Sequence, residues 1–454
     1  MPDLPSGLTG KVMNSVCFND NYPVIERSLE MHAKAKKLIP GATQTLAKGT
    51  TQHSFGVSPV FLDRGKGAIV WDIDGNEYLD YTMGVGPVVL GYCYEPVDYA
   101  ISQQLTRGIS FSLTHPLEVQ VASLLHDIIP NAEMVRFSKT GADVTSAAVR
   151  LARAYTGRNV ILCCGYHGWH DWYIATTDRT LGVPDFNKEL TYTFAYNDTE
   201  SLLSAIDGSV AAVIMEPATF SAPRDNFLHK VREICHQNGS LLIFDEMWTG
   251  FRLALGGAQE YFGVKADLAC FSKAIANGMP LSALTGCADV MKLLEQDVFF
   301  YTTFGGETLS LAAAVATIEE LRDNNIPSVL DTLGRKLKTG INKLIADIGL
   351  PYILCSGFPC RTMLNIDSNI ADANILKTYI QQELIKRGIL WNGFHTLSAS
   401  HTQEDIQYTL EAYDDIFTQL HALVKRNELH ELLRGEVIQP AFRKTTHFNS
   451  KPRR

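Results

Sequence analysis

Hydrophobic residues recur along the middle of this chain in short, nearly unbroken runs that alternate with amphipathic stretches. Runs of four or five apolar residues are typical of strands buried on both faces of a parallel sheet, and apolar residues spaced three and four apart are typical of helices. The predicted strands are Met134–Phe137, Val160–Cys164, Ala211–Met215, Leu241–Phe244 and Leu268–Phe271. The predicted helices are Leu117–Ile129, Ser146–Tyr155, Phe227–Asn238 and Leu309–Asn324. This alternation predicts an α/β fold with a mostly parallel sheet and helices on both of its faces.

The pattern changes at both ends of the chain. Residues 25–38 have helical spacing, a polar loop follows over 42–56, and residues 60–81 alternate around Asp74-Gly75 in the manner of a β-hairpin. After about residue 330, helices alternate with short strands, which favours a smaller α+β domain. We therefore predict an N-terminal segment over 1–90 that packs with the small domain, a large α/β domain over 91–328, and a small α+β domain over 329–454.

Composition and charge narrow the functional classes. The formal net charge of −9 and the pI of about 5.8 argue against nucleic acid or an anionic membrane surface as a partner. The nine cysteines lack metal-ligand spacing, so we predict no metal site and interpret them as reduced thiols of a cytoplasmic protein. The N-terminus lacks a signal-peptide pattern, and no apolar run reaches transmembrane length. A solvated tail is expected to hold the basic residues Arg443, Lys444, Lys451, Arg453 and Arg454.

Charged side chains follow directly after two of the predicted strands. Asp245 and Glu246 come after Leu241–Phe244, and Lys273 follows Leu268–Phe271 and one serine. Ligands of open α/β sheets bind at the carboxyl ends of the strands, and charges buried there are costly unless they have partners. An acid and a lysine at this edge predict a pyridoxal phosphate site, because the lysine suits the Schiff base and Asp245 suits the pyridinium nitrogen.

A phosphate group requires backbone N–H groups and hydroxyls at a helix N-terminus. The candidate is the turn Thr140-Gly141-Ala142, where Gly141 allows a close approach of the backbone and Thr140 offers a hydroxyl. After the next strand, Tyr166 and His167 offer rings that could stack on a flat heterocycle. Taken singly, such a turn and such a loop are more often structural, and each gains weight only from its neighbours.

Five motifs together carry a specific resemblance. They read FSKTGADVTSAAVRLARAYTG from Phe137, YHGWHD from Tyr166, IMEP from Ile214, DEMWTGFR from Asp245 and SKAIANGMP from Ser272. Their order and spacing resemble the class III aminotransferases of the type I pyridoxal phosphate fold, in particular the group that contains glutamate-1-semialdehyde aminomutase. The resemblance implies a large domain with a mostly parallel, seven-stranded type of sheet and a smaller α+β domain.

The resemblance also implies roles for individual residues. Lys273 would form the Schiff base with pyridoxal phosphate, and Asp245 would hold the protonated ring nitrogen. Tyr166 or its neighbour His167 would stack on the ring or line it. Glu216 matches a glutamate near the ring edge, and a purely structural carboxylate is an equally good interpretation of it.

The same resemblance implies a homodimer with shared active sites. The cofactor phosphate would be bound by Gly141 with Thr140 and the amide of Ala142. Family members commonly carry a second hydroxyl where this chain has Ala142. Thr303, in the stretch TTFGG, would reach the phosphate in the neighbouring subunit.

Departures from the family bear on the substrate. The aminomutase has an arginine after its Pro-Gly turn that can hold a carboxylate, whereas here Pro40-Gly41 precedes ATQTLAKGTTQHSFG, in which Lys48 is the only cation. The aminomutase also has a glutamate in its C-terminal domain, and the matching residues 391–396 contain none. The family's usual Gly-Asn-Pro is Gly306-Glu307-Thr308. This combination is similar to aminomutase-like aminotransferases of surface-polysaccharide and modified-sugar pathways, and a pocket of Thr, Gln, Asn and His suits a polyhydroxylated ligand.

We therefore expect an aminotransferase that moves an amino group from an amino acid, with glutamate as the expected donor, to a ketone or aldehyde on a sugar or sugar-derived compound. An intramolecular glutamate-1-semialdehyde aminomutase is one alternative, against which the missing arginine and glutamate argue. A non-catalytic member that binds the cofactor or a partner protein is another, against which Lys273 and Asp245 argue.

Overall fold

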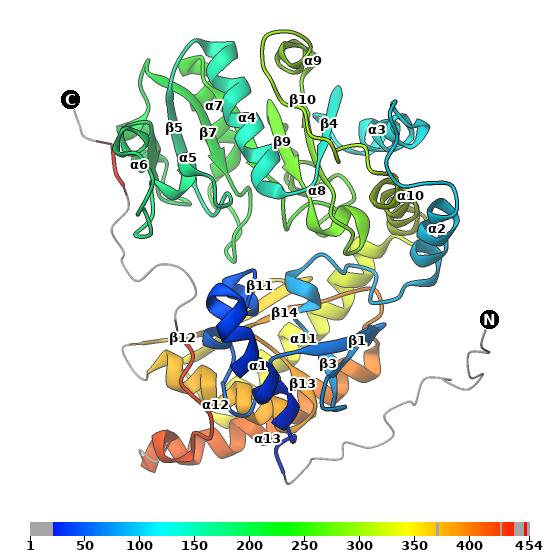
Figure 1. Cartoon of the computed structure of the whole chain (residues 1–454). Helices are drawn as coiled ribbons and strands as arrows, with labels where there is room; N and C mark the ends of the chain where they lie inside the picture. Colours follow the sequence, from blue (N-terminus) through cyan, green and yellow to red (C-terminus); the bar gives the residue numbers. More distant parts are fainter. Residues whose placement is uncertain (1–20, 369–371, 427–428, 440–448, 452–454) are drawn as a thin grey trace.

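The computed structural model describes residues 21–368, 372–426, 429–439 and 449–451, which form two lobes (Figure 1). The strands are β1 Leu62–Lys66, β2 Ile69–Asp72, β3 Glu77–Asp80, β4 Met134–Ser138, β5 Val160–Cys164, β6 Thr191–Thr193, β7 Val210–Met215, β8 Leu241–Asp245, β9 Leu268–Phe271, β10 Ser282–Gly286, β11 Ile353–Phe358, β12 Arg361–Ile366, β13 Ile389–Leu390 and β14 Phe394–Thr396. The α-helices are α1 Glu26–Leu38, α2 Glu95–Leu105, α3 Pro116–Ile128, α4 Gly141–Thr156, α5 Asp171–Ile174, α6 Thr199–Ala205, α7 Phe227–Asn238, α8 Gly257–Phe262, α9 Ala288–Met291, α10 Thr308–Asp323, α11 Ile326–Ile348, α12 Ala373–Lys386 and α13 Gln403–Arg426.

The upper lobe in Figure 1 is built on a seven-stranded sheet with the order β4-β10-β9-β8-β7-β5-β6. Strand β10 runs antiparallel to both of its neighbours, and the other neighbouring strands pair in parallel. The predicted fold, with its mostly parallel seven-stranded sheet, is confirmed. All five predicted strands are present in this sheet, whereas β6 and β10 were not predicted.

Alternate residues of the central strands enter two separate cores, one on each face of the sheet. In β8, Ile243 packs in the core that includes Ala148 of α4, while Leu242 and Phe244 pack in the core that includes Val231 of α7. All five side chains are fully excluded from solvent. This two-sided burial explains why the strand sequences are continuous apolar runs, as expected for a parallel sheet covered on both faces.

The lower lobe contains a sheet with the order β1-β2-β3-β13, in which β3 and β13 pair in parallel. The predicted hairpin is present: Asp72 accepts hydrogen bonds from the backbone N–H groups of Asp74 and Asn76, and Gly75 has a φ of +94°. The segment that follows residue 329 therefore shares a sheet with residues from the first ninety. The three-part division into 1–90, 91–328 and 329–454 stays a prediction.

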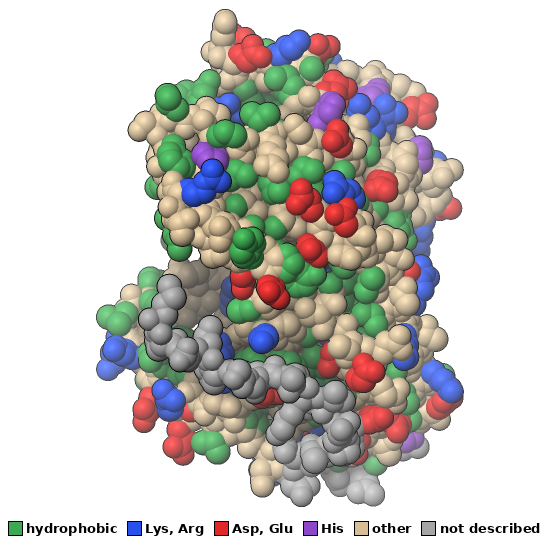
Figure 2. Space-filling model, turned by 90° about the vertical axis from the view of Figure 1, so that its right-hand side faces the viewer, with side chains coloured by type: hydrophobic (Ala, Val, Ile, Leu, Met, Phe, Trp, Pro, Cys, Tyr) green, Lys and Arg blue, Asp and Glu red, His purple; other side chains and the backbone are tan. Residues whose placement is uncertain are grey.

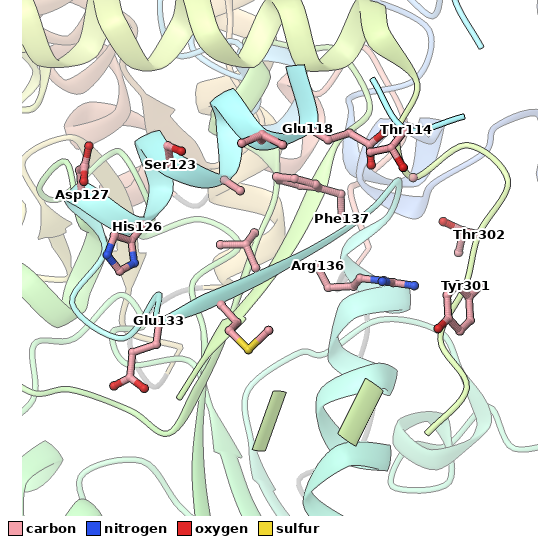
Figure 3. A pocket seen from close by; sticks show the side chains of 16 residues that line it. Thr114, Glu118, Ser123, His126, Asp127, Glu133, Arg136, Phe137, Tyr301 and Thr302 are labelled. Carbon is pink, nitrogen blue, oxygen red and sulfur yellow. The ribbon is translucent and has the colours of Figure 1, made fainter. Parts of the chain in front are cut away.

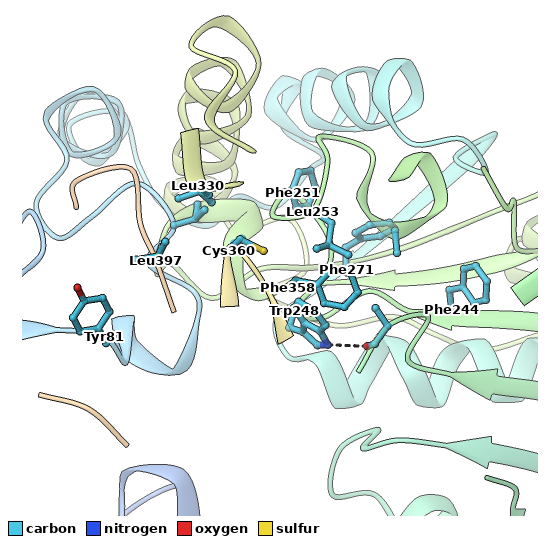
Figure 4. Close-up of a cluster of buried hydrophobic side chains, with 14 of the residues drawn as sticks. Tyr81, Phe244, Trp248, Phe251, Leu253, Phe271, Leu330, Phe358, Cys360 and Leu397 are labelled. Atoms are coloured by element: carbon cyan, nitrogen blue, oxygen red, sulfur yellow. Dashed lines mark hydrogen bonds between the residues drawn. The ribbon is translucent and has the colours of Figure 1, made fainter. Parts of the chain in front are cut away.

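A continuous apolar cluster joins the lobes, and Figure 4 shows part of it. Phe244 and Phe271 come from the large sheet, whereas Phe358 and Leu397 come from the lower lobe. Arg252 reinforces this contact: its Nη1 donates to the carbonyl of Leu397 over 2.6 Å, and its Nη2 donates to the carbonyl of Gly86 over 2.8 Å. The lobes therefore share buried apolar and polar contacts beside the carboxyl ends of β8 and β9.

The chain near its C-terminus differs from the predicted solvated tail. Lys451 Nζ lies 2.6 Å from Asp207 Oδ1, and the carbonyl of Asn449 accepts a hydrogen bond from the N–H of Thr193. The hydrogen bond from Lys451 holds the pKa of Asp207 well below its usual range. The prediction was wrong for Lys451, because an acidic partner lies within its reach. The other four basic residues of the predicted tail lie outside the described residues.

The surface bears out the modest charge of the sequence on the face that Figure 2 shows, where acidic and basic side chains are interspersed among apolar ones. Across the described ranges, none of the helices has the length and apolar character needed to cross a membrane.

Candidate active site

Asp245 is the last residue of β8, and its carboxylate is buried. One oxygen, Oδ2, lies 2.8 Å from His167 Nδ1, and the other accepts a hydrogen bond from the backbone N–H of Met247 over 3.0 Å. These contacts fix the orientation of the carboxylate at the edge of the sheet, as a residue with a directional role requires.

Lys273 follows β9, which pairs with β8. The register places Asp245 opposite Cys270, so Lys273 comes three residues after the partner of Asp245. Its backbone has a φ of +48°, in the left-handed region that side chains other than glycine seldom adopt. Burial, followed by the charge of Arg361, lowers the pKa of Lys273 to about 8. Within the described part of the chain, its amino group forms no hydrogen bond or ion pair. The strained backbone thus presents an amine that has no partner among the described residues and whose pKa lies close to neutral pH.

Glu216 follows β7, the neighbour of β8 on the other side. Burial, followed by the charge of Asp245, raises the pKa of its carboxyl to about 6. Gly165, with a φ of +110°, leaves room for it, since a Cβ at that position would lie 2.9 Å from Glu216 Cγ. The Glu216 carboxylate has no hydrogen-bond partner among the described residues, and its charge interacts with that of Lys273.

The predicted phosphate turn forms the N-terminus of α4. Thr140 caps this helix by a reciprocal pair of hydrogen bonds with Asp143, and the first backbone N–H groups of a helix lack partners within it. A Cβ on Gly141 would lie 2.6 Å from Met247 Sδ, so only glycine brings the helix this close to the turn after Asp245.

Ala142 has a packing reason to lack the hydroxyl common in the family. Its side chain is buried, and a Cβ on Gly168 would lie 2.8 Å from Ala142 Cβ. The YHGWHD loop therefore crosses directly over this methyl group, which leaves little room for a larger side chain.

The two ring candidates lie in different surroundings. His167 is buried against Asp245, and its Nε2 is a buried atom without a hydrogen-bond partner. Tyr166 is 51% exposed and packs edge-on against Tyr173. Burial, followed by the negative charge of Asp245, raises the pKa of the Tyr166 phenol. His167 thus contacts the acid directly, whereas Tyr166 is the accessible ring on the same side.

Glu246 directly follows Asp245, but its carboxylate does not face Lys273 and Glu216 as an unbonded group. Its carboxylate accepts hydrogen bonds from the Thr249 hydroxyl and from the backbone N–H groups of Ala258 and Gln259, over 2.8 and 3.0 Å. The last two N–H groups belong to the first turn of α8. Glu246 is therefore a fully bonded cap that positions the DEMWTGFR turn.

The stretch around Thr303 lies beside the end of β4 rather than among the residues described above. A Cβ on Gly305 would lie 2.9 Å from the carbonyl of Phe137, and Lys139 forms a 2.9 Å ion pair with Glu307. Thr303 is exposed and makes no hydrogen bond with any residue that the structure describes. Within one chain it does not join Lys273 and Asp245.

A hollow of about 790 Å³ lies next to this stretch, between α3, β4 and residues 301–306. Figure 3 shows side chains that line it. Large apolar side chains are exposed around it or on the loop before α3, namely Phe111, Leu113, Val119, Tyr301 and Phe304, with exposed fractions from 50% to 85%. An apolar surface of this kind is typical of a protein–protein contact.

Arg361 is the first residue of β12 and approaches Lys273 and Glu216 from the lower lobe. We did not predict this residue from the sequence. Its guanidinium carbon lies 4.9 Å from the centre of the Phe220 ring, 5.2 Å from that of Trp248 and 5.1 Å from that of Phe394. Its charge acts on both Lys273 and Glu216. One sequence signal pointed to it: Arg361 is the only charged residue between Leu350 and Ile366.

The chemistry of these groups fits pyridoxal phosphate. A helix N-terminus for the phosphate, an oriented carboxylate for the ring nitrogen and an unpartnered lysine on adjacent strands are the groups that this cofactor needs. No protein partner satisfies the Lys273 amine or the Glu216 carboxylate among the residues that the structure describes. The arrangement is thus incomplete as a purely structural core and suited to a bound ligand.

Comparison with known proteins agrees with this chemistry. Residues 50–396 match the family model described as aminotransferase class III. The chain is 35% identical over 415 residues to the 3-aminobutyryl-CoA aminotransferase of Cloacimonas acidaminovorans, covering 88% of this chain and 99% of that protein. It is 35% identical over 425 residues to the glutamate-1-semialdehyde 2,1-aminomutase of Archaeoglobus fulgidus, covering 86% and 99%.

A solved structure shows the same extent of likeness. The FumI protein of Sphingopyxis sp. MTA144, in its PLP internal aldimine form, superposes with a TM-score of 0.82 at 28% identity, covering 90% of this chain and 99% of that one. The likeness therefore extends over both lobes.

Proposed function

The chain belongs to the class III aminotransferases, a family that depends on pyridoxal phosphate, and we propose that it moves an amino group from an amino acid donor, glutamate in the first instance, to a ketone or aldehyde. The observation that carries this proposal is the pair Asp245 and Lys273, at the carboxyl ends of adjacent strands, with an amine that no described residue engages. This pair also argues against a non-catalytic member of the family.

The proposed mechanism assigns a task to each residue. Bound pyridoxal phosphate supplies an aldehyde that captures amines and a ring that accepts electrons. When pyridoxal phosphate is bound, Lys273 Nζ would hold its aldehyde carbon, and the same amine would carry a proton at the substrate carbon. Asp245 keeps the ring nitrogen protonated, because a buried carboxylate favours a neighbouring positive charge. His167, bonded to Asp245, keeps that carboxylate in place.

The remaining proposed residues position the cofactor. Thr140, Gly141 and the amide of Ala142 bind the phosphate at the start of α4. Tyr166 covers the ring from its accessible side. Glu216 borders the ring edge as an acid that changes charge near pH 6, since its pKa is raised to about 6.

We propose a sugar or a sugar-derived compound in polysaccharide biosynthesis as the acceptor. A hollow of about 410 Å³ is lined by the polar side chains of Lys48, His53, Asp80 and Thr82, and by apolar ones such as Val60, Leu62 and Leu390. It also includes Gly84, two residues before Gly86, where a Cβ would lie 3.9 Å from Lys273 Cδ. Its polar groups come from the loop over 42–56, the end of β3 and the segment after it. These polar side chains offer hydrogen bonds to the hydroxyl groups of such a ligand.

The aminomutase reaction is the second candidate, and Arg361 favours it. The sequence offered two points against this reaction, a missing arginine in the loop after Pro40-Gly41 and a missing glutamate in residues 391–396. Arg361 supplies a guanidinium from another strand, so the first point loses its weight, while the second still counts against the aminomutase. The 35% identity to an aminomutase over nearly the full length also supports this candidate.

Separate half-reactions distinguish the candidates. In the pyridoxal form, an aminotransferase should convert glutamate to 2-oxoglutarate and leave the aminated cofactor, which is visible in the absorption spectrum. An aminomutase should convert glutamate-1-semialdehyde without any donor, at an efficiency typical of a dedicated enzyme. If neither reaction occurs with protein that has been loaded with cofactor, the catalytic proposal fails.

Asp245→Asn tests the acid within the same assay. The amide should keep the fold but lower turnover by about a hundredfold, since a preorganised charge beside the reacting system is lost. Turnover close to wild type would remove Asp245 from the mechanism.

We propose a homodimer in which Thr303 completes the phosphate site of the neighbouring subunit. The exposed apolar side chains around the hollow of Figure 3 support a contact on this face. If Lys273→Ala and Thr303→Trp are each inactive, mixed dimers should regain activity, because one of their two sites combines the intact residues. Subunit exchange without any recovery would contradict the shared site. A cytoplasmic location is proposed from the cysteine pattern of the sequence alone.

A further inference from the structure

Arg361 lies beside three aromatic rings at the edge of the proposed active site. Phe220 and Phe394 stack on each other with their centres 4.8 Å apart and their planes at 14°, and the guanidinium lies within 5.2 Å of both rings and of Trp248. Aromatic rings attract a cation through their faces but accept no strong hydrogen bonds. The rings therefore fix the position of the guanidinium without satisfying its N–H groups.

The hydrogen-bond donors of Arg361 have no partner in the described protein. A guanidinium carries five N–H donors, and its side chain makes no hydrogen bond or ion pair with any described residue. Burial is the main cause that lowers the pKa of Arg361, to about 10, so the group remains charged. A partly buried charge without hydrogen bonds is costly unless a ligand supplies the acceptors.

The position of the guanidinium follows from its neighbours. Phe220 and Trp248 lie on the turns that follow Glu216 and Asp245, which places Arg361 beside these acids. The charge of Arg361 also acts to lower the pKa of Lys273 and that of Glu216. It nevertheless lies beyond ion-pair distance of Glu216, which leaves its N–H groups available.

We propose that Arg361 is the residue that binds the carboxylate of the amino acid donor and thereby sets its position relative to Lys273. This inference rests on the proposed aminotransferase function and names the donor's recognition group. A planar guanidinium forms two parallel hydrogen bonds with a carboxylate, and the N–H groups of Arg361 have no acceptor among the described residues. A single guanidinium beside the acid Glu216 suits one negative charge better than a doubly charged phosphate.

Binding of a non-reacting dicarboxylate tests the inference without any turnover. Glutarate should bind to the cofactor-loaded protein in calorimetry, and Arg361→Met should weaken this binding by about ten- to a hundredfold. Arg361→Lys keeps the charge without the planar fork and should fall between the two. The matched control is Arg64→Met, because Arg64 also lies over an aromatic ring, 4.8 Å from Trp71, but is exposed and far from Lys273 in the fold. It should bind glutarate like the wild type.

A panel of amines locates the carboxylate that Arg361 contacts. In the donor half-reaction, Arg361→Met should raise KM for glutamate much more than KM for propylamine, which has no carboxylate. A loss with alanine assigns Arg361 to the carboxylate next to the amine, whereas a loss with 4-aminobutyrate assigns it to the distal one, and either result supports the inference.

Several outcomes would overturn the inference. Wild-type glutarate affinity in a folded, cofactor-loaded Arg361→Met variant would do so. So would loss of binding in Lys48→Met in place of Arg361→Met, or wild-type protein that binds no dicarboxylate. If the wild type binds glutarate through Arg361 but reacts with none of the amines, the proposed function fails and the carboxylate site stands.

Discussion

Arg252 and Arg361 are two arginines at the contact between the lobes, and their surroundings differ in one respect. Arg252 is buried and donates to two backbone carbonyls, those of Leu397 and Gly86. Arg361 is held by three aromatic rings and donates to no described residue. Since buried polar groups in proteins are nearly always hydrogen-bonded, Arg252 belongs to the architecture, whereas Arg361 awaits a ligand.

The same contrast separates two glutamates at the carboxyl end of the sheet. Glu246 accepts from a hydroxyl and two backbone N–H groups, while Glu216 accepts from no described group. Burial alone therefore does not mark the site, because all four side chains are at least partly buried. Within these two pairs, unmet hydrogen-bonding capacity distinguishes the residue beside Lys273, and it can be tested one residue at a time.

The largest expected effect concerns Lys273, whose amine has no hydrogen-bond partner among the described residues. Lys273→Ala should lower turnover by about a thousandfold or more, because the proton carrier is lost. The variant should fold, and borohydride should no longer fix the cofactor to the protein, as peptide mapping can verify. A label on another lysine in the wild type would refute the assignment.

The next largest effect concerns Arg252, whose guanidinium is hydrogen-bonded to two backbone carbonyls. Arg252→Met should lower the free energy of unfolding by about 3 kcal/mol, because the buried carbonyl of Leu397 and the partly buried carbonyl of Gly86 lose a charged donor. Denaturant titration measures this change, and the matched control is Arg64→Met, an exposed arginine that should cost little. If Arg252→Met is as stable as the wild type, the two hydrogen bonds of Arg252 contribute nothing to stability.

The pH dependence of cofactor capture tests whether the Lys273 amine is buried and without a partner. Burial lowers its pKa from 10.5 to about 8, so the neutral amine becomes about tenfold more abundant with each pH unit up to 8 and then levels off. The rate at which the apoprotein captures pyridoxal phosphate should follow this curve. A rate that keeps rising toward pH 10.5 would show an ordinary, solvated lysine, and Lys273→Ala serves as the blank.

The smallest effect is also the most discriminating. Arg361→Met should raise the free energy of unfolding by about 1 kcal/mol, because it replaces a partly buried, unbonded charge by an apolar group of similar length. The same substitution at Arg252 is expected to act in the opposite direction. If both substitutions destabilise the protein equally, the distinction between the two arginines is wrong.

Sequence patterns anticipated the part of the site that depends on the parallel sheet. Asp245 and Lys273 each follow an apolar run, and the carboxyl ends of adjacent parallel strands must meet. Strand β10 was not anticipated, because SALTG lacks the bulky apolar residues that mark its neighbours. Arg361 was missed for another reason: its approach to Lys273 depends on how the lower lobe packs against the sheet, which periodicity does not encode.

The contact between His167 and Asp245 was also beyond the sequence. Both residues were assigned to the ring site, but the left-handed backbone of the neighbouring Gly165 and Gly168 decides which ring turns inward. The structure directs His167 toward the acid and leaves Tyr166 accessible. Adjacent residues on a loop can exchange such roles without any change in composition.

The short contact at Asn449 has a consequence for how these molecules behave in a crowded solution. Strand β6 is one of the two outer strands of the large sheet, and an open outer strand invites pairing with another chain. The Asn449 carbonyl accepts from the Thr193 N–H, and its side-chain amide donates to the carbonyls of Lys188 and Thr191. These bonds occupy backbone groups of β6 that another strand would need for pairing. We therefore expect this segment to hinder edge-to-edge association of two sheets, at a distance from the catalytic groups.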